Sequence, residues 1–432
     1  MEDSGLKPTS PIRVLFLAWG FSIHARRRIQ AFEGDPDFSV AVVSTHNYNF
    51  DRARNVLLRD ARKDIDRRNA VPQPEVPRKE PSGTAAFLER VRKALSRALR
   101  VFLLLEFHRE FRKMAKDSAI LRNAVKEFRP QVIFLQTLLY PCYLAFLMPR
   151  SIPIVITFWN GDVTWWATSN GFERVFKKTL VTYGVRRAKA LTVNSRAAMQ
   201  ACHAYGVPGE KISLIRYPGI DREKFRSSSK REAREALGIG ADKVILCPRG
   251  LGGYLNSDVI VESAARVVER YPDALFLCIS GVGIGKVLEQ HRERVRQLGL
   301  ERNFRWDGQV DWERMPVYYN AADAMVSISS NDSLPNCMME ALACEVPVIM
   351  GDIPQIREWI DDGRNGFLVP PRDPERLSGK ILDVLGRPPE GIRQIAEEGL
   401  DLVKREFDGS IHMRSVKDLI REVANSCTTP SG

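Results

Sequence analysis

Two carboxylates, Asp332 and Glu340, have seven residues between them and lie on either side of a Leu-Pro step. Carboxylates spaced in this way around a turn can accept hydrogen bonds from the hydroxyl groups of a sugar or a ribose. The turn itself, Ser333-Leu334-Pro335-Asn336, carries backbone N–H groups that can bind an anion. An alternative interpretation gives both acids structural roles, with Asp332 as a helix cap and Glu340 as an exposed helix residue.

The elements that must position these residues can be predicted from the flanking sequence. The apolar run Ala324–Ser329 predicts a buried strand. Residues Pro335–Ala343 lack β-branched side chains and predict a helix, with the proline tolerated in its first turn. A strand, a tight turn and a helix N-terminus, in that order, form a ready site for an anion such as a phosphate group.

The rest of the chain alternates short β-rich runs with helical patterns, which predicts the α/β class with parallel sheets and right-handed crossovers. A break at Pro218-Gly219, followed by a charged helix at Lys230–Leu237, indicates the boundary between two domains. The remaining predicted strands are Arg13–Trp19, Ser39–Ser44, Val132–Gln136, Ile152–Phe158, Ala190–Asn194, Ile212–Arg216, Val244–Cys247, Leu275–Ser280, Phe304–Trp306, Val346–Met350 and Phe367–Val369.

This pattern predicts two Rossmann-like domains that face each other across a cleft, the usual place for a nucleotide in this class. Residues 1–218 are expected to form the first domain, with a basic helical insertion at about residues 51–130. Residues 219–405 are expected to form the second. Residues 406–432 then supply a C-terminal helix that returns to the first domain, and a short tail.

Composition favours a soluble globular protein. The chain has 432 residues, of which 44% are hydrophobic and 27% charged. Its seven cysteines include no Cys-x-x-Cys pair, which favours reduced thiols in a cytoplasm over disulfides or a zinc site. The polar stretch Met1–Pro11 shows no signal peptide, and the apolar run Val101–Leu105 is too short to span a bilayer.

The net charge of +12 is concentrated in one segment. Residues 51–130 contain 21 lysines and arginines against 11 acidic residues, which accounts for ten of the twelve charges. Within this segment Thr84–Phe128 has an amphipathic helical pattern, so an anionic membrane surface is a candidate partner. The alternative is a helix whose apolar stripe packs on a sheet. Nucleic-acid binding is not expected, because no aromatic-basic platform accompanies the charge.

Other residues with possible chemistry follow predicted strands. Arg249 comes directly after Cys247-Pro248, where a guanidinium could hold a diphosphate through two parallel hydrogen bonds. The alternative is a surface arginine. The glycines Gly281 and Gly283 form a turn that could approach a phosphate, or simply a turn, and the spacing is not that of a P-loop.

Two further sets complete the candidate residues. Gly20 opens a loop after the first strand, and His24 in that loop is a candidate acceptor contact or a surface histidine. Two Asp-x-Asp triplets, at residues 35–37 and 64–66, do not end an apolar strand, so no metal site is predicted there.

One long stretch, from Phe304 to Leu385, resembles the C-terminal domain of the retaining glycosyltransferases of family 4, which have the GT-B fold. It includes the sequences S-N-D-S-L-P-N-C-M-M-E-A-L-A-C-E-V-P-V-I and D-D-G-R-N-G-F-L-V-P-P. Supporting matches are Pro218-Gly219-Ile220-Asp221 with Phe225, and Thr157-Phe158-Trp159-Asn160-Gly161-Asp162.

The resemblance implies roles for the residues that match the motif. Asp332 would contact the hydroxyls of the donor sugar, and Glu340 those of the ribose. Backbone N–H groups near Leu334 and Asn336 would meet the sugar or the diphosphate, and Arg249 would bind the diphosphate. Asn160 and Asp162 are further candidates for the acceptor side or the cleft, together with Gly20 and His24 from the loop after the first strand.

The chain also departs from the family pattern. Asp332 stands where the family has a glutamate, so its reach is one methylene shorter. Tyr254 and Leu255 occupy the place where the family often has a lysine, and Trp159 and Glu345 replace a common histidine and a common glycine.

The expected function is therefore transfer of a sugar from a nucleoside-diphosphate sugar to an acceptor hydroxyl with retention, in cell-surface glycan or glycolipid synthesis. The nucleotide sugar is a co-substrate, and neither a cofactor nor a metal is expected. A glycan or lipid-linked acceptor is the expected partner, in the cytoplasm or at the inner face of the plasma membrane. The alternatives are a GT-B scaffold subunit with weak activity and a sugar-nucleotide epimerase.

Overall fold

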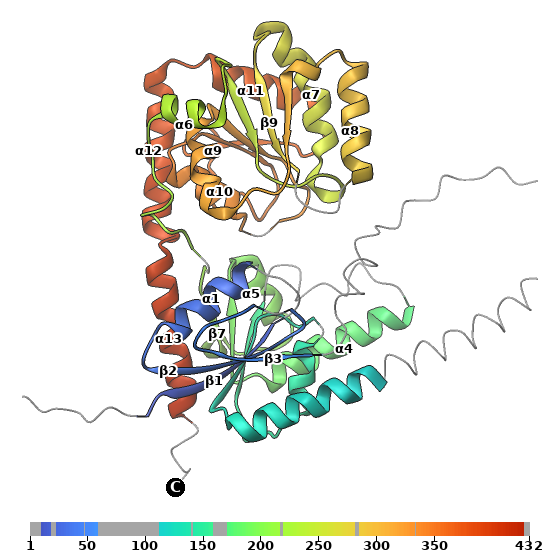
Figure 1. Ribbon diagram of the computed structural model, residues 1–432, viewed down its shortest axis with the longest axis vertical. Helices are drawn as coiled ribbons and strands as arrows, with labels where there is room; N and C mark the ends of the chain where they lie inside the picture. Colours follow the sequence, from blue (N-terminus) through green and yellow to red (C-terminus); the bar gives the residue numbers. More distant parts are fainter. Residues whose placement is uncertain are drawn as a thin grey trace, which may run out of the picture. The chain divides into compact units, whose positions relative to one another are not determined.

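The computed structural model describes residues 10–18, 23–46, 48–58, 112–139, 141–158, 171–216, 219–280, 285–332 and 334–426, with the backbone alone for residues 23–24 and 171–173. The described chain forms two compact units (Figure 1). The first comprises Met1–Thr157, Asn170–Leu191 and Ile420–Gly432, and the second comprises Phe158–Ser169 and Thr192–Leu419.

A seven-stranded sheet has the strand order β3-β2-β1-β4-β5-β6-β7. The strands from β3 to β5 in this order pair in parallel, and the order along the chain reverses between β1 and β4. Strand sequences such as IRVLFLA and IVITF are apolar along their length, which is typical of a parallel sheet covered on both faces. The strands are β1 Ile12–Ala18, β2 Phe38–Ser44, β3 Arg54–Leu57, β4 Val132–Leu135, β5 Ile154–Phe158, β6 Ala190–Val193 and β7 Ile212–Leu214.

A six-stranded parallel sheet forms the centre of the second unit, with the order β10-β9-β8-β11-β12-β13. Here the order along the chain reverses between β8 and β11. The predicted pair of parallel sheets, and with it the α/β class of two Rossmann-like domains, is confirmed. The strands are β8 Val244–Cys247, β9 Leu275–Ile279, β10 Phe304–Asp307, β11 Ala324–Ser327, β12 Val348–Gly351 and β13 Phe367–Val369.

Helices connect the strands. The predicted charged helix at Lys230–Leu237 is confirmed as α6, whose N-cap Ser229 accepts a hydrogen bond from Glu232 N and whose C-cap is the left-handed Gly238. Residues 112–128 are also helical. The other α-helices are α1 Ile23–Glu33, α4 Gly171–Arg187, α5 Arg196–His203, α7 Ser257–Arg270, α8 Gly285–Gln297, α9 Met315–Ala321, α10 Asn336–Ala343, α11 Pro374–Gly386, α12 Pro389–Glu406 and α13 Gly409–Asn425. Short 3₁₀ turns are η1 Cys142–Leu147, η2 Gly209–Lys211, η3 Gly253–Leu255, η4 Glu301–Asn303 and η5 Trp312–Arg314.

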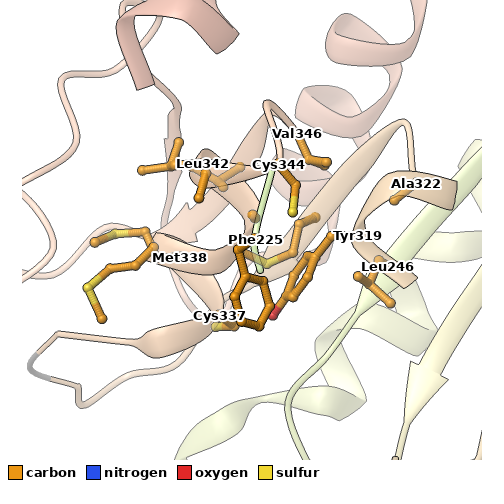
Figure 2. Packing of buried hydrophobic residues seen from close by; sticks show 14 of the residues in the cluster. Phe225, Leu246, Tyr319, Ala322, Cys337, Met338, Leu342, Cys344 and Val346 are labelled. Atoms are coloured by element: carbon orange, nitrogen blue, oxygen red, sulfur yellow. The ribbon is translucent and has the colours of Figure 1, made fainter. Parts of the chain in front are cut away.

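The sheet of the second unit has a hydrophobic core on each face. Along β8, Val244 and Leu246 belong to one core, whereas Ile245 and Cys247 belong to the other. This alternation follows from the two-residue period of a strand. Helices α6, α9, α10 and α12 contribute to the first core, and α7, α8 and α11 contribute to the second. Figure 2 shows residues of α9 and α10 in the first core.

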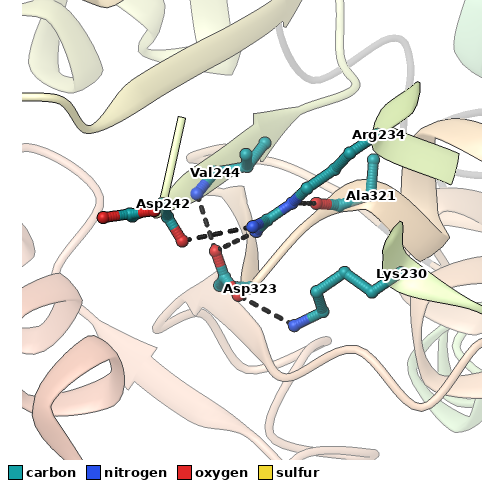
Figure 3. A network of polar contacts seen from close by, with 6 residues as sticks. All are labelled: Lys230, Arg234, Asp242, Val244, Ala321 and Asp323. Atoms are coloured by element: carbon teal, nitrogen blue, oxygen red, sulfur yellow. Dashed lines mark hydrogen bonds and ion pairs between the residues drawn. The ribbon is translucent and has the colours of Figure 1, made fainter. Parts of the chain in front are cut away.

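A polar network fixes the amino ends of β8 and β11 (Figure 3). The Asp323 carboxylate, just before β11, accepts a hydrogen bond from Val244 N at 2.7 Å. It also pairs with Arg234 and Lys230 of α6 at 2.6 and 2.8 Å. Arg234 donates in addition to the Ala321 carbonyl oxygen at 3.0 Å. The two strands that flank the reversal of the sheet therefore start from one anchored point.

Gly219 and Ile220 pack tightly against the junction between α12 and α13. Ile220 N donates to Phe407 O at 2.7 Å, and Gly409 N donates to Ile220 O at 3.1 Å. Gly219 has a φ of +65°, and a β-carbon there would lie 2.6 Å from the Gly409 Cα. Only glycine fits this position without strain.

The basic segment at residues 51–130 differs in part from its prediction as a helical insertion. Arg54–Leu57 forms the edge strand β3, where cross-strand hydrogen bonds with β2 outweigh the lack of an apolar pattern. The helix at residues 112–128 agrees with the end of the predicted amphipathic pattern. Residues 59–111, which hold most of the predicted insertion, lie outside the described part of the chain.

The C-terminal residues form α13, whose residues from Ile420 onward belong to the first unit. There Arg421 pairs with Asp37 at 2.7 Å and lies over the ring of Phe38. The predicted domain limits at residues 218 and 405 stay a prediction.

Candidate functional site

Arg249 and Asp332 meet at the point where the strand order of the second sheet reverses. Arg249 follows β8 and Asp332 follows β11, and these strands are neighbours. Open α/β sheets bind ligands at the carboxyl ends of the two strands that flank such a reversal. The Arg249 Nη1 donates to the Asp332 Oδ2 at 2.8 Å, and Ser329 Oγ donates to the same oxygen at 3.0 Å. The sequence predicted both residues, but not their ion pair.

The loops that carry the two residues are fastened to each other. Asn256, which is buried and has a φ of +51°, donates from Nδ2 to Ile328 O at 2.8 Å and to Ser330 Oγ at 2.7 Å. Ser330 N donates to Tyr254 O at 2.7 Å. Tyr254 takes part in this link through its backbone, so its position does not depend on the identity of the side chain.

Burial and neighbouring charge act in opposite directions on Arg249. Burial alone would lower its pKa, but Cys337 and Asp332 raise it, and the net direction is upward. The guanidinium is therefore a permanent cation. The Cys337 thiol beside it is buried, and burial raises its pKa although Arg249 opposes this shift. This cysteine behaves as a small apolar residue and not as a nucleophile.

The N-terminus of α10 lies next in sequence to this ion pair. The helix begins at Asn336, one residue later than predicted, and Pro335 at its N-cap makes no side-chain capping hydrogen bond. Of the predicted turn, Ser333 lies outside the described residues, and Leu334 is buried in the core. The N-cap position is held by Pro335 and not by Asp332, whose carboxylate bonds with Arg249 and Ser329.

Glu340 is buried, with 6% of its surface exposed, so the alternative of an exposed helix glutamate is wrong. The reason is that α10 buries residues around its whole circumference, from Cys337 to Ala343. The Glu340 Oε1 accepts a hydrogen bond from Trp312 Nε1 at 3.0 Å, and Oε2 accepts one from Tyr319 OH at 2.8 Å. The sequence-based prediction missed both donors.

The Pro-Gly-Ile-Asp motif continues into this cluster. The Asp221 Oδ1 accepts hydrogen bonds from Glu223 N and Lys224 N, both at 3.1 Å, and its carbonyl accepts one from Phe225 N at 2.8 Å. This turn directs Phe225, 1% exposed, against the rings of Trp312 and Tyr319. Burial of such a side chain contributes about 1.5–3 kcal/mol.

A histidine relay supports the loop after β8. Gly252 N donates to Ser257 Oγ at 2.8 Å, and Ser257 Oγ lies 2.9 Å from His291 Nε2. The His291 Nδ1 lies 2.9 Å from Val287 O, so Nδ1 is the protonated nitrogen and Nε2 accepts from the serine. Burial lowers the pKa of His291. Neutral His291 therefore ties α8 to the loop that carries Arg249.

The corresponding reversal in the first sheet holds a buried arginine that the sequence-based prediction missed. Arg28 of α1 is 1% exposed, and its Nη1 donates to Gln136 Oε1 at 3.1 Å and to Thr157 Oγ1 at 2.6 Å. Gln136 follows β4 and Thr157 lies in β5, so both mark the carboxyl edge of the sheet. The signal available in the sequence was weak, because Arg28 is one of three successive arginines.

Several predicted site residues lie outside the described part of the chain. Their roles stay predictions, and the same holds for His24, of which only the backbone is described. The residues outside are Ser333, Gly281, Gly283, Gly20, Asn160 and Asp162.

The described residues contain no group of three or more histidine, cysteine, aspartate or glutamate side chains arranged to hold a metal ion. No helix in the described ranges has the length and apolar character that crossing a membrane requires.

Similarity to solved structures defines the fold. Sucrose-phosphate synthase from Thermosynechococcus elongatus superimposes with a TM-score of 0.70 at 17% identity, over 96% of this chain and 100% of that one. HepE from Anabaena, solved with UDP-glucose, gives 0.68 at 17% identity, over 95% and 100%. WaaG, a glycosyltransferase involved in lipopolysaccharide biosynthesis, gives 0.64 at 14% identity, over 95% and 99%. The chain therefore has the GT-B fold.

Two family models cover most of the chain. Residues 37–224 match Glycosyltransferase Family 4, and residues 229–399 match Glycosyl transferases group 1. The chain belongs to the family 4 glycosyltransferases, as the sequence motifs predicted.

The curated relatives include several D-inositol 3-phosphate glycosyltransferases. The protein from Catenulispora acidiphila is 29% identical over 254 residues, which cover 54% of this chain and 58% of the relative. The protein from Geodermatophilus obscurus is 32% identical over 211 residues, which cover 47% of each. The chain spans about half the length of the curated relatives it matches.

Proposed function

We propose that the protein transfers a sugar from a nucleoside-diphosphate sugar to an acceptor hydroxyl with retention of configuration. The observation that carries the proposal is the position of Arg249 and Asp332 at the reversal point of the second sheet, beside the N-terminus of α10. A fixed cation and a helix N-terminus together suit a diphosphate. The UDP-glucose bound to HepE, a protein of the same fold, gives this choice of ligand further support.

Each residue has a separate task in this mechanism. Arg249 binds the diphosphate and stabilises the charge that develops on it as the bond between the anomeric carbon and the phosphate oxygen breaks. Asp332 accepts hydrogen bonds from the sugar hydroxyls, and Glu340 accepts them from the ribose. The acceptor oxygen attacks the same face of the sugar, and its proton passes to the departing phosphate oxygen.

The names of the curated relatives bear on the acceptor. The relatives named for D-inositol 3-phosphate favour a small phosphorylated polyol or a lipid that contains one. A role in cell-surface glycan or glycolipid synthesis would place the acceptor at the inner face of the plasma membrane. The basic residues between 51 and 130 would then contact anionic lipid.

A thermal-shift panel of UDP-, GDP- and ADP-sugars tests the donor assignment. A bound donor raises the unfolding temperature with the logarithm of its concentration. The variant Arg249→Gln should lose this shift, whereas Arg393→Gln, which alters an exposed ion pair on α12, should keep it. A donor that shifts the Arg249→Gln variant as much as the wild type would refute the site.

Product analysis separates the proposal from the two alternatives. Release of nucleoside diphosphate only in the presence of an acceptor indicates transfer and excludes an epimerase. The observation that favours a weakly active scaffold subunit is the presence of Asp332 where the family has a glutamate. Turnover of any nucleotide sugar by the purified chain, lost in Arg249→Gln, would exclude that alternative.

A further inference from the structure

Glu340 lies at the centre of an aromatic cluster in the first core of the second unit. Its carboxylate oxygens accept hydrogen bonds from two aromatic side chains, Oε1 from Trp312 Nε1 at 3.0 Å and Oε2 from Tyr319 OH at 2.8 Å. Tyr319 is fully buried, and burial and the Glu340 charge raise its pKa well above the ordinary value. The phenol therefore stays protonated and acts as a hydrogen-bond donor throughout the physiological range.

The two donors are themselves held in place. Phe225 contacts both, with ring centroids 5.3 Å from Trp312 and 6.1 Å from Tyr319 (Figure 2 shows the Tyr319 side). The Lys224 Nζ lies 3.8 Å from the centre of the Trp312 ring and forms an ion pair with Glu313. The cation over the indole and the contact with the buried Phe225 ring restrict the rotation of Trp312.

We infer that Trp312 and Tyr319 are positioning residues that fix the Glu340 carboxylate for the ribose hydroxyls of the donor. This inference rests on the proposed function. A carboxylate offers about four acceptor positions, so the bonds from Trp312 and Tyr319 do not by themselves saturate it. The bonds from Trp312 and Tyr319 hold the carboxylate in one orientation before the nucleotide arrives, which reduces the entropy lost on binding.

The geometry also distinguishes Trp312 and Tyr319 from a merely structural pair. If they only filled space, replacing either with phenylalanine would change packing alone and would not act selectively on the ribose hydroxyls. The Trp312 N–H and the Tyr319 O–H both donate to the carboxylate assigned to the ribose. Removing these groups should therefore alter recognition of the ribose and leave recognition of the diphosphate intact.

The test compares the affinities of UDP and 2′,3′-dideoxy-UDP, measured by calorimetry, because their ratio isolates the ribose hydroxyls. Hydrogen bonds to a charged group are worth about tenfold or more in affinity, so the wild type should bind UDP about tenfold more tightly. Glu340→Gln should reduce this ratio to about one to three. Trp312→Phe and Tyr319→Phe should each reduce it about threefold, and the double variant should match Glu340→Gln.

Tyr318→Phe is the matched control. Tyr318 neighbours Tyr319 on α9, and its OH donates to Asp307 Oδ2 at 2.6 Å, so the variant loses an equivalent bond to a different carboxylate. It should keep the wild-type ratio. If Trp312→Phe and Tyr319→Phe keep the ratio while Glu340→Gln loses it, the positioning role is wrong and the proposed function stands. If the wild type binds neither nucleotide, the proposed donor site fails and the inference with it.

Discussion

The ion pair between Arg249 and Asp332 predicts that one substitution will separate nucleotide binding from sugar transfer. Arg249 is assigned to the diphosphate and Asp332 to the sugar hydroxyls, yet in this structure the two side chains bond to each other at 2.8 Å. A diphosphate must therefore compete with Asp332 for the guanidinium. Asp332→Asn keeps the shape of the side chain and removes its charge, so it should bind UDP more tightly and transfer sugar more slowly.

The size of the effect follows from the exposure of the pair. Two charges 4 Å apart attract by about 4 kcal/mol at an effective dielectric constant of 20, before the cost of desolvation. Exposed pairs retain about 0.2–1 kcal/mol, whereas breaking a buried pair costs about 3–5 kcal/mol. Arg249 and Asp332 have 26% and 13% of their side-chain surface exposed, which lies between these cases. About 1–2 kcal/mol is expected, a factor of about 5–30 in affinity.

Calorimetric titration of UDP into the wild type and Asp332→Asn measures this factor directly. The control is Asp352→Asn, which removes the partner of Arg357 from an ion pair elsewhere in the second unit and should leave UDP affinity unchanged. Equal or weaker binding of UDP by Asp332→Asn would refute the competition. Arg249 would then not be the residue that contacts the diphosphate.

Three further predictions concern stability and are measured by urea denaturation. Gly219→Ala should lower the free energy of unfolding by about 1–3 kcal/mol or more, because the residue has a positive φ and its β-carbon would meet the Gly409 backbone. The control Gly240→Ala has open space around it and should change stability by less than about 0.5 kcal/mol. Equal effects of the two substitutions would contradict the packing argument. Burial lowers the pKa of His291, so the unfolded state takes up the proton first as the pH falls. The contribution of His291 to the free energy of unfolding should therefore be complete above pH 6.5 and decline below it. Between pH 7.5 and 5.5 the variant His291→Gln should lose less stability than the wild type. Asp323→Ala should cost about 3–5 kcal/mol, because it leaves Arg234, only 17% exposed, without its carboxylate; a loss below about 1 kcal/mol would show that solvent replaces the network.

The strands of both sheets were predictable because burial on two faces leaves nearly continuous apolar runs. Each of the twelve predicted strands has a counterpart, with ends that differ by up to two residues. Strand β3 was not predictable in this way. Its residues, Arg54–Leu57, lie at the sheet edge and are mostly exposed, so their hydrogen bonds with β2 leave no trace in the hydropathy pattern.

The candidate site was predictable only as far as local sequence reaches. Arg249 and Asp332 each follow an apolar run, and the rule for strand ends identifies both. The bonds from Trp312 and Tyr319 to Glu340 span 28 and 21 positions and depend on how α9 and α10 pack, which no local pattern encodes. The burial of Glu340 could have been predicted from the sequence, since all the remaining residues from Cys337 to Ala343 are apolar.

The packing of Gly219–Phe225 determines where the second unit can be cut from the chain. The family model for this half begins at residue 229, but Ile220 and Phe225 are part of its hydrophobic core. A recombinant fragment starting at residue 229 would lack the ring that supports Trp312 and Tyr319, and would expose apolar surface in its place. A fragment starting before Gly219 and continuing beyond Gly409 would keep both. The segment that matches the family model is thus shorter than the segment that keeps the hydrophobic core of the second unit. The longer segment is the one that must be exchanged when this unit is swapped between relatives.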